Sequence, residues 1–388
     1  MSDICLYFQV HQPMRLSKFS FFDIGKGKEY FDRKANKFYL KRVARKCYLP
    51  ANKLMLELIN KYNGRFRVNY SITGVLLEQL EEFVPEVIDS FQALTDTGCV
   101  ELFNETYYHS LSWLISKEEF SEQVKMHRKK IKELFGLKPK VFRNTEAMYS
   151  NDIARAATEL GFKGIVCEGL QRILGWKSPN YVYKASGSDI RVLLRNFQLS
   201  DDVAFRFSEH SWKEFPLTAD KYAYWIASSP GDCINLFMDY ETFGEHQWSE
   251  TGIFSFLASL PGEVFKHSSL EFALASEIIE KHPPRGEFDS PGIISWADVD
   301  RDLTAWLENK MQQQAFSELR GLENKARKAK GNILEDWRKL QTSDHFYYMC
   351  TKWFADGDVH KYFNHYESPY DAFINYMNVL TDLKSRLS

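Results

Sequence analysis

One short stretch of the chain combines several side chains that could do chemistry. The segment "INLFMDYETFGEH" begins as an apolar run, and Asp239, Glu241, Glu245 and His246 follow it within a few residues. A second carboxylate, Glu146, stands in "VFRNTEAMYS", again just past an apolar run. Carboxylates and imidazoles act as general acids and bases or as metal ligands. The elements that position these side chains indicate which of these roles applies.

Short apolar runs alternate with amphipathic segments along the first part of the chain. This alternation predicts a parallel sheet built from right-handed strand–helix–strand units. Seven strands favour a barrel of the (β/α) type over an open sheet. We expect helices at 118–137 and at 151–162, the second with Asn151 as its N-cap. The expected strands are 4–10, 66–72, 99–103, 140–145, 164–168, 190–195 and 233–239.

The pattern changes after "PGEVFKH". We expect a helix at 268–282, a long charged helix at 298–330 and a final amphipathic helix at 369–387. The sequence therefore predicts two regions. Residues 1–284 form a catalytic barrel, and residues 285–388 form a helical region that packs on the barrel and contributes to its cleft.

Composition excludes several classes of function. The formal net charge is −2 and no basic block occurs, which argues against nucleic acid and anionic membranes as partners. No long apolar run and no secretory signal are present, so we expect a cytoplasmic protein without a membrane partner. The six cysteines are widely spaced and lack a C-x-x-C pair, which is typical of buried thiols in a reducing compartment.

Polar residues follow every predicted strand. In parallel α/β barrels the active site lies at the carboxyl ends of the strands. Polar residues at all seven of these ends therefore predict a functional pocket. A helix cap or a salt bridge would explain any one of them taken alone. The candidates, in chain order, are Gln9 and His11, then Glu78, His109, Glu146, Glu168, Arg195, Asp239 and Glu241.

Glu146 and Asp239 are the strongest pair among these candidates. Two carboxyl groups that face each other across a barrel mouth are the equipment for hydrolysis of a glycosidic bond. One attacks or stabilises the anomeric carbon, and the other protonates the leaving oxygen and later activates water. Glu168 is a rival for the first role because it also ends a strand. Glu241 could raise the pKa of Asp239 by like-charge repulsion if both face the same way, although capping a following turn explains Glu241 equally well.

Five segments resemble, in order, the five motifs of glycoside hydrolase family 57 in its α-amylase branch. They are "FQVHQPMRL", "SITGVLLEQL", "FRNTEAMYS", "MDYETFGEH" and "SWADVDRDLTAWLEN". "NETYYHSL" and the later "SDHFYYMCTKWFADGDVHKYF" are also similar to that branch. The resemblance covers nearly the whole chain. It implies an incomplete, TIM-like (β/α)7 barrel followed by a C-terminal helical layer.

The resemblance also implies a retaining reaction on α-1,4-glucans such as maltodextrin, starch or glycogen, without a metal or other cofactor. By the match of motifs, Glu146 is the nucleophile and Asp239 is the acid/base. His11 should line the donor sugar subsite, and the start of the fifth motif, with Trp296 and Asp298, should reach the cleft. Much of the wider family has a second histidine where this chain has Gln9, so the product pattern is open.

The aromatic residues and histidines leave further interpretations open. Trp248 is the best candidate for an exposed ring that stacks on glucose, because it lies in the loop after "GEHQ". His11, His109 and His246 stand near carboxylates and allow a metal hypothesis, as in metal-dependent polysaccharide deacetylases. The pattern of that class, with paired acids at the first strand and an H-x-x-x-H helix, is missing. The favoured role of these histidines is therefore to bind sugar hydroxyls by hydrogen bonds or to hold loops in place.

Two other functions are compatible with the same residues. A 4-α-glucanotransferase or a glucan branching enzyme would use the same carboxylates and pass the glycosyl group to a sugar hydroxyl instead of water. A non-catalytic glycan-binding protein would bind maltodextrin without turnover. We expect an α-glucan oligosaccharide or polysaccharide as the partner in each case.

Overall fold

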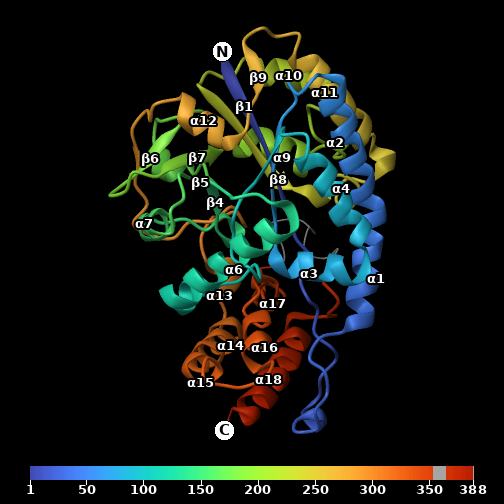
Figure 1. The fold of residues 1–388 in the computed structure, drawn as a ribbon, viewed down its shortest axis with the longest axis vertical. Coiled ribbons are helices and arrows are strands. Elements are labelled where there is room, and N and C mark those ends of the chain that lie inside the picture. Colours follow the sequence, from blue (N-terminus) through green and yellow to red (C-terminus); the bar gives the residue numbers. More distant parts are fainter. Residues whose placement is uncertain (353–363, 388) are drawn as a thin grey trace.

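A computed structural model describes residues 1–352 and 364–387 of the 388-residue chain. Figure 1 shows the strands in the upper part of the molecule, with helices along their sides. The C-terminal helices, drawn in orange and red, lie together below them, and the two termini are at opposite ends. The last part of the "SDHFYYMCTKWFADGDVHKYF" motif, 353–363, lies outside the described residues.

All seven expected strands form. They are short, and most of their residues are buried, because helices cover the outside of the strands and side chains fill the inside. They are β1 (Ser2–Val10), β2 (Val68–Ile72), β3 (Val100–Leu102), β4 (Val141–Arg143), β5 (Gly164–Glu168), β7 (Arg191–Arg195) and β8 (Cys233–Asp239).

The strands form two sheets whose edges meet. The first has the order β3-β2-β1-β8, with β9 (Leu270–Phe272) also on β1. The second has the order β10-β6-β7-β5-β4, and within it only β6 (Tyr183–Ala185) is antiparallel, to β7. Backbone hydrogen bonds join β3 to β4, from Arg143 N to Asn104 O at 2.8 Å, and β7 to β8, from Asn196 N to Asn235 O at 2.9 Å. The seven parallel strands therefore close into the expected incomplete TIM-like barrel.

Helices connect the strands and cover the barrel. Ser116 is the N-cap of α6, since its hydroxyl accepts from Glu119 N at 3.0 Å, and Gly136, with a φ of 68°, is the C-cap. The helices of this part are α1 (Arg33–Val43), α2 (Leu49–Lys61), α3 (Gly74–Phe83), α4 (Pro85–Thr95), α5 (Ser112–Ile115), α6 (Lys117–Phe135), α7 (Asn151–Glu159), α8 (Gln171–Leu174), α9 (Phe197–Ala204), α10 (Ala219–Ala227), α11 (Ile253–Val264) and α12 (Ala275–Lys281).

The structure differs from three local predictions. The expected helix at 268–282 begins with β9, because Leu270 and Phe272 alternate with Glu271 and pair with the start of β1. The N-cap of α7 is Ser150 rather than Asn151, since the Ser150 hydroxyl accepts from the N–H of Ile153 at 3.3 Å. The predicted long helix at 298–330 is three helices.

Asn309 explains the break in that helix. Its side chain caps a new helix by accepting from Gln312 N at 2.9 Å, while the Gln312 side chain accepts from Asn309 N at 3.1 Å. The final helix, α18, forms where it is expected. The C-terminal helices are α13 (Thr304–Leu307), α14 (Lys310–Gly321), α15 (Glu323–Ala326), α16 (Ile333–Lys339), α17 (Ser343–Tyr347) and α18 (Pro369–Arg386).

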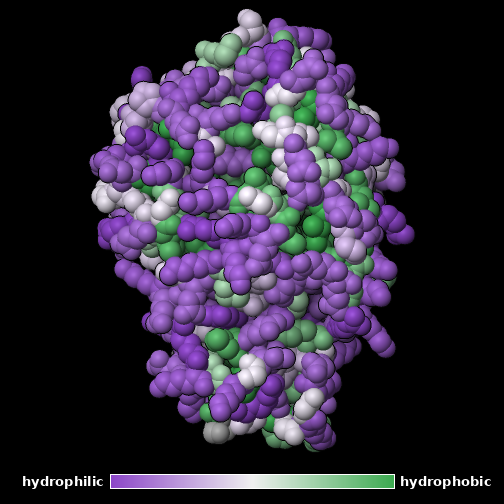
Figure 2. Space-filling model, viewed as in Figure 1, coloured by the Kyte–Doolittle hydropathy of each residue, from purple (hydrophilic) through white to green (hydrophobic). Residues whose placement is uncertain are grey.

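The division of the chain at residue 285 stays a prediction. Past this residue the chain first adds β10 (Glu287–Phe288) to the second sheet, and only then enters the helices. In the described residues no helix is long and apolar enough to cross a membrane. Hydrophilic residues cover most of the face in Figure 2, and apolar residues show between them. All six cysteines are free, and five of them are buried.

Aromatic and aliphatic side chains fill the barrel below its carboxyl end. Tyr7 stacks on Phe103 with ring centroids 4.8 Å apart and meets the edge of Phe237 at 5.3 Å. The Tyr7 hydroxyl lies 2.6 Å from the Ser71 hydroxyl and donates to Gln9 at 2.9 Å. This layer is where the apolar interior gives way to polar side chains, so it forms the floor of the site above it.

Candidate active site

A pocket opens at the carboxyl end of the barrel. It has a volume of about 130 Å³, and both sheets contribute to it, since Glu146 follows β4 and Asp239 ends β8. Thr242 and His246, from the segment "INLFMDYETFGEH" that also holds Asp239, line the pocket as well. Eight of the twelve predicted site residues line this pocket: Gln9, His11, His109, Glu146, Arg195, Asp239, Glu241 and Trp296.

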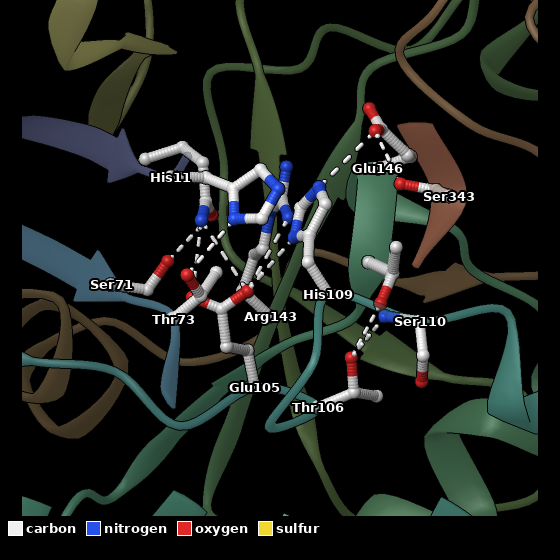
Figure 3. A network of polar contacts seen from close by, with 12 residues as sticks. His11, Ser71, Thr73, Glu105, Thr106, His109, Ser110, Arg143, Glu146 and Ser343 are labelled. Atoms are coloured by element: carbon white, nitrogen blue, oxygen red, sulfur yellow. Dashed lines mark hydrogen bonds and ion pairs between the residues drawn. The ribbon is translucent and has the colours of Figure 1, made fainter. Parts of the chain in front are cut away.

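Three donors from three parts of the chain fix the Glu146 carboxylate. Its Oε1 lies 3.1 Å from His109 Nε2 and accepts from the Ser343 hydroxyl at 3.1 Å, as Figure 3 shows. Its Oε2 accepts from the indole N–H of Trp296 at 3.0 Å. Glu146 itself has a φ of 55°, a left-handed conformation that costs energy for a residue with a side chain. The surrounding contacts stabilise this turn and aim the carboxylate into the pocket.

Nearby positive charge keeps Glu146 ionised. Burial by itself would raise the pKa of this carboxyl, but the hydrogen bond and charge of His109, together with Arg143, lower the pKa to about 2. Glu146 is therefore a carboxylate at neutral pH and is able to act as a nucleophile.

Asp239 lies in an environment that favours its protonated form, in contrast to Glu146. It is the last residue of β8 and stands beside Gln9 in the register with β1. Its carboxyl group makes no hydrogen bond and no ion pair with the described residues. Burial and the negative charge of Glu146 raise its pKa to about 6, against the opposing charges of Arg143, His109 and Arg195. Asp239 therefore keeps its proton under mildly acidic conditions, as a general acid must.

Two stacked histidines form one wall. The rings of His11 and His109 lie 4.1 Å apart. The ring nitrogens of His11 face the Thr73 hydroxyl at 2.9 Å and Asp344 at 3.1 Å. Burial and the neighbouring His109 lower the pKa of His11, whereas hydrogen bonds with carboxylates raise the pKa of His109 to about 9, against the effect of burial. One ring is therefore neutral and the other charged.

The protein itself occupies the ring nitrogens of both histidines. Protein partners lie on both nitrogens of His11 and, as Glu105 and Glu146, on both nitrogens of His109. Within residues 1–352 and 364–387, no group of three or more histidine, cysteine, aspartate or glutamate side chains is arranged to bind a metal ion.

The backbone does not stay extended from Asp239 to Glu241, which was the condition for the two carboxyl groups to face the same way. Glu241 sits in the single turn Tyr240–Thr242 directly after β8. Its carboxyl accepts from the Tyr48 hydroxyl and from His11 N at 3.4 Å. Burial and the charge of Asp239 raise the pKa of Glu241 to about 8. The pKa of Asp239, in contrast, is raised mainly by burial and then by Glu146.

Trp296 and Arg195 complete the pocket wall. The Trp296 ring lies 4.8 Å from the guanidinium of Arg143 and 5.8 Å from that of Arg195. Arg195 donates from Nε to Phe237 O at 2.7 Å and pairs with Glu168 at 3.1 Å. Gln9 lines the pocket, but its amide donates to Glu105 at 3.1 Å.

Four of the predicted residues do not line this pocket. Glu168 is buried between Arg195 and Arg301, which lies 2.5 Å away, so it forms an ion-pair cluster beside the pocket. Glu78 accepts from the Tyr107 hydroxyl at 2.8 Å. Trp248 is 55% exposed on the surface, and Asp298 pairs with Lys352 at 3.4 Å.

The sequence prediction missed Arg143. It lies at the end of β4 and lines the pocket, and none of its three guanidinium nitrogens has a hydrogen-bond partner among the described residues. The nearest carboxylate oxygen, from Glu105, is 3.9 Å away. An arginine with 0% exposure and no hydrogen-bond partner is costly unless a ligand or water accepts its hydrogen bonds. The sequence feature that could have identified Arg143 is its charge within the strand-like run "VFRN", shortly before Glu146.

Ser343 and Asp344 were also missed. They belong to α17, about two hundred residues after Glu146, yet Ser343 donates to Glu146 and Asp344 faces His11. Nothing local in the sequence distinguishes these two residues. Only the similarity of the "SDHFYYM" segment to the family motif pointed to this part of the chain.

Comparisons with known proteins identify the family of the chain. Residues 5–291 match the model of Glycosyl hydrolase family 57. The chain is 50% identical over 398 aligned positions, 98% of its own length and 84% of the relative's, to a protein of Methanocaldococcus jannaschii that carries the provisional name alpha-amylase.

Solved structures share the fold at low sequence identity. A branching enzyme from Thermococcus kodakaraensis superposes with a TM-score of 0.70 at 14% identity, over 93% of this chain and 87% of that one. A 4-alpha-glucanotransferase from Thermococcus litoralis superposes with a TM-score of 0.66 at 17% identity, over 89% of this chain and 56% of that one.

Proposed function

Since the chain belongs to glycosyl hydrolase family 57, we propose that it is a retaining α-glucan hydrolase of the α-amylase type, which cleaves α-1,4-glucosidic bonds in maltodextrin, starch or glycogen. One observation carries the proposal. Two carboxyl groups in one pocket have pKa values displaced in opposite directions, to about 2 for Glu146 and about 6 for Asp239. A retaining glycosidase needs this division between an ionised nucleophile and a protonated acid.

The first step of the proposed reaction forms a covalent intermediate. A carboxylate oxygen of Glu146 attacks the anomeric carbon from its β face while Asp239 gives its proton to the glycosidic oxygen. The bond from the anomeric carbon to the leaving oxygen breaks, and the product is a β-glycosyl ester on Glu146. The three donors on Glu146 orient the attacking carboxylate.

The second step reverses these roles. Asp239, now ionised, takes a proton from a water molecule whose oxygen attacks the anomeric carbon from the α face. The ester bond breaks and Glu146 leaves as a carboxylate. The surroundings that lower its pKa also make it a good leaving group. Two inversions give net retention of the α configuration.

Azide tests the two roles with an activated substrate such as a 4-nitrophenyl α-maltooligoside. In Asp239→Ala, azide should attack the glycosyl ester from the α face and yield an α-glycosyl azide. In Glu146→Ala, azide should take the place of the missing carboxylate and yield a β-glycosyl azide. The opposite pairing of products, or near-normal turnover of maltooligosaccharides by either variant without azide, would refute the assignment.

The products of a maltooligosaccharide series separate hydrolysis from transfer. Hydrolysis releases one new reducing end per bond cleaved. Chains longer than the substrate, or α-1,6 links, without a matching rise in reducing ends would instead identify a 4-α-glucanotransferase or a branching enzyme that uses the same two carboxyl groups. Binding without any turnover would identify a glycan-binding protein.

A further inference from the structure

Glu105 lies behind the pocket, next to His109. It follows β3, has 0% exposure and is not among the residues that line the pocket. Its Oε2 lies 3.2 Å from His109 Nδ1, and the other ring nitrogen of His109 lies 3.1 Å from Glu146 Oε1. Figure 3 shows the imidazole between the two carboxyl groups. The three side chains form a line of carboxylate, imidazole and carboxylate.

This geometry specifies the protonation state of His109. A neutral imidazole has one N–H, whereas both of its neighbours here are carboxylate oxygens, which accept. Both contacts become hydrogen bonds only if both ring nitrogens carry protons. His109 is therefore an imidazolium whose two N–H groups point in opposite directions, one at Glu105 and one at Glu146.

Glu105 is itself fixed in place. Gln9 Nε2 donates to Oε1 at 3.1 Å, and Arg143 Nη1 lies 3.9 Å from Oε2. Its backbone N–H donates to His127 Nδ1 at 3.3 Å. A few residues on, His109 has a φ of 51°, a conformation that this short, tightly bonded loop stabilises. The loop therefore presents the imidazole in one orientation.

We propose that Glu105 is a positioning residue: its buried carboxylate keeps His109 doubly protonated and aimed at Glu146, and so keeps the nucleophile ionised and oriented. The proposal rests on the function proposed above, in which Glu146 attacks the sugar. Glu105 does not touch the substrate in this account, and it acts only through His109.

The charges around the pocket explain why a second carboxylate is needed. While Glu146 carries the glycosyl ester it has no charge. His109 would then stand beside the cation of Arg143 and the neutral ring of His11, and among the described residues only Glu105 would still offer it a carboxylate within hydrogen-bond distance. Burial would raise the pKa of Glu105, but His109 and Arg143 lower it to about 2, so Glu105 keeps its negative charge. The imidazolium therefore keeps a partner and retains its proton. His109 is therefore ready to stabilise Glu146 when the ester breaks.

Several other groups act on the same imidazole. Its pKa is raised to about 9 because the hydrogen bonds with Glu105 and Glu146 outweigh burial and the charge of Arg143. The charged and titratable groups around it are Glu105 on its own loop, Arg143 at the end of β4, Glu146 after β4, His11 after β1 and Asp239 at the end of β8, and Asp344 on α17 faces the neighbouring His11.

Glu105→Gln tests the proposal, because it keeps the size and an acceptor oxygen but removes the charge. We expect kcat to fall roughly 10- to 100-fold with a smaller change in KM, since one charge-assisted contact on His109 is lost. The ¹⁵N NMR signals of His109 should show two protonated nitrogens at pH 7.5 in the wild type and one in Glu105→Gln. In Glu105→Gln the decrease of kcat/KM at alkaline pH should become steeper, because both Asp239 and His109 then lose a proton in that range.

Matched variants separate this role from a structural one. Glu105→Asp keeps the charge and should restore double protonation of His109 at least in part. Asp3→Asn removes another buried carboxylate, with 2% exposure, at the start of β1, and should leave the His109 signals and the slope of the pH profile unchanged. A fall in kcat in Glu105→Gln with His109 still doubly protonated at pH 7.5 would overturn the proposal.

The NMR measurement does not require an active enzyme. The proposed function and the proposed role of Glu105 can therefore be refuted independently of each other. A wild-type protein without activity on any maltooligosaccharide contradicts the proposed function. A wild-type protein that is active but has a neutral His109 at pH 7.5 contradicts the role of Glu105, and this second measurement applies even if Glu105→Gln does not fold.

Discussion

The two carboxyl groups of the pocket stand in contrasting surroundings. Glu146 receives contacts from His109, Ser343 and Trp296 and lies near the cation of Arg143. Asp239 receives no hydrogen bond from the described residues and has Glu146 as its main source of nearby charge. The same type of functional group therefore becomes an anion on one side of the pocket and a neutral acid on the other.

The difference shows that position in the fold, more than residue type, sets acidity here. The contacts of Glu146 come from the loop after β3, from the segment after β10 and from α17. The Asp239 carboxyl at the end of β8 makes no hydrogen bond with the described residues, and it feels Glu146 and the nearby cations only through their charge. Several chain segments converge on Glu146 and not on Asp239, which explains why their acidities differ. Variants of each residue test this difference.

The largest effect should come from removal of either carboxyl group. We expect Glu146→Gln and Asp239→Asn to lower kcat/KM on maltooligosaccharides by about 10³-fold or more, because nucleophilic and general acid catalysis are lost. With a 4-nitrophenyl leaving group, which needs no protonation, only Asp239→Asn should recover a fast first step, seen as a burst of nitrophenol. Asp152→Asn, an exposed carboxylate on α7, is the control. A burst in Glu146→Gln would contradict the assignment.

Loss of the indole donor should have the next largest effect. Trp296→Phe keeps an aromatic ring and removes the N–H that reaches Glu146 Oε2, so about 1.5–3 kcal/mol of stabilisation of the carboxylate is at stake. We expect kcat to fall roughly 10- to 100-fold and the acid limb of the pH profile to move to higher pH. Trp176→Phe, at a side chain that is 92% exposed, should change neither.

The pH profile of the wild-type protein tests the difference in pKa between Glu146 and Asp239. Glu146 has a lowered pKa of about 2, so it is ionised above that pH, and Asp239 has a raised pKa of about 6, so it is protonated below that pH. We therefore expect kcat/KM to fall about tenfold per pH unit above pH 6 and to resist acid until the protein unfolds. In Glu146→Gln the pKa of Asp239 should decrease, since a negative neighbour is gone. Infrared titration of the carboxyl band checks this direction.

The smallest effect should come from Ser343→Ala. The serine shares Oε1 of Glu146 with His109, so the imidazolium still stabilises the carboxylate after the hydroxyl is lost. We expect a loss of about 0.5–1.5 kcal/mol, or roughly two- to tenfold in kcat. Ser211→Ala, in an exposed loop, is the control. A loss as large as that of Trp296→Phe would show that the hydroxyl acts on more than Glu146.

Local sequence patterns were enough to predict most of the barrel. All seven predicted strands form because their residues are mostly apolar and are buried at nearly every position, as strands covered on both faces require. The predictions that failed, at β9 and within 298–330, concern short elements. Their ends depend on a partner strand or on one capping side chain, here the start of β1 and Asn309. β6 and β10 were missed for the same reason, since each is only a few residues long.

Sequence patterns were sufficient to predict which carboxylates lie at strand ends, and therefore that Glu146 and Asp239 could share one barrel mouth. Three features became visible only in the folded chain: Glu168 pairs with two arginines beside the pocket, α17 brings Ser343 to Glu146, and Glu105 lies behind His109. The two kinds of feature depend on residues at different distances along the chain. Strand patterns depend on neighbours in the sequence, whereas acidity depends on burial and on charges a few ångströms away, which distant parts of the chain supply.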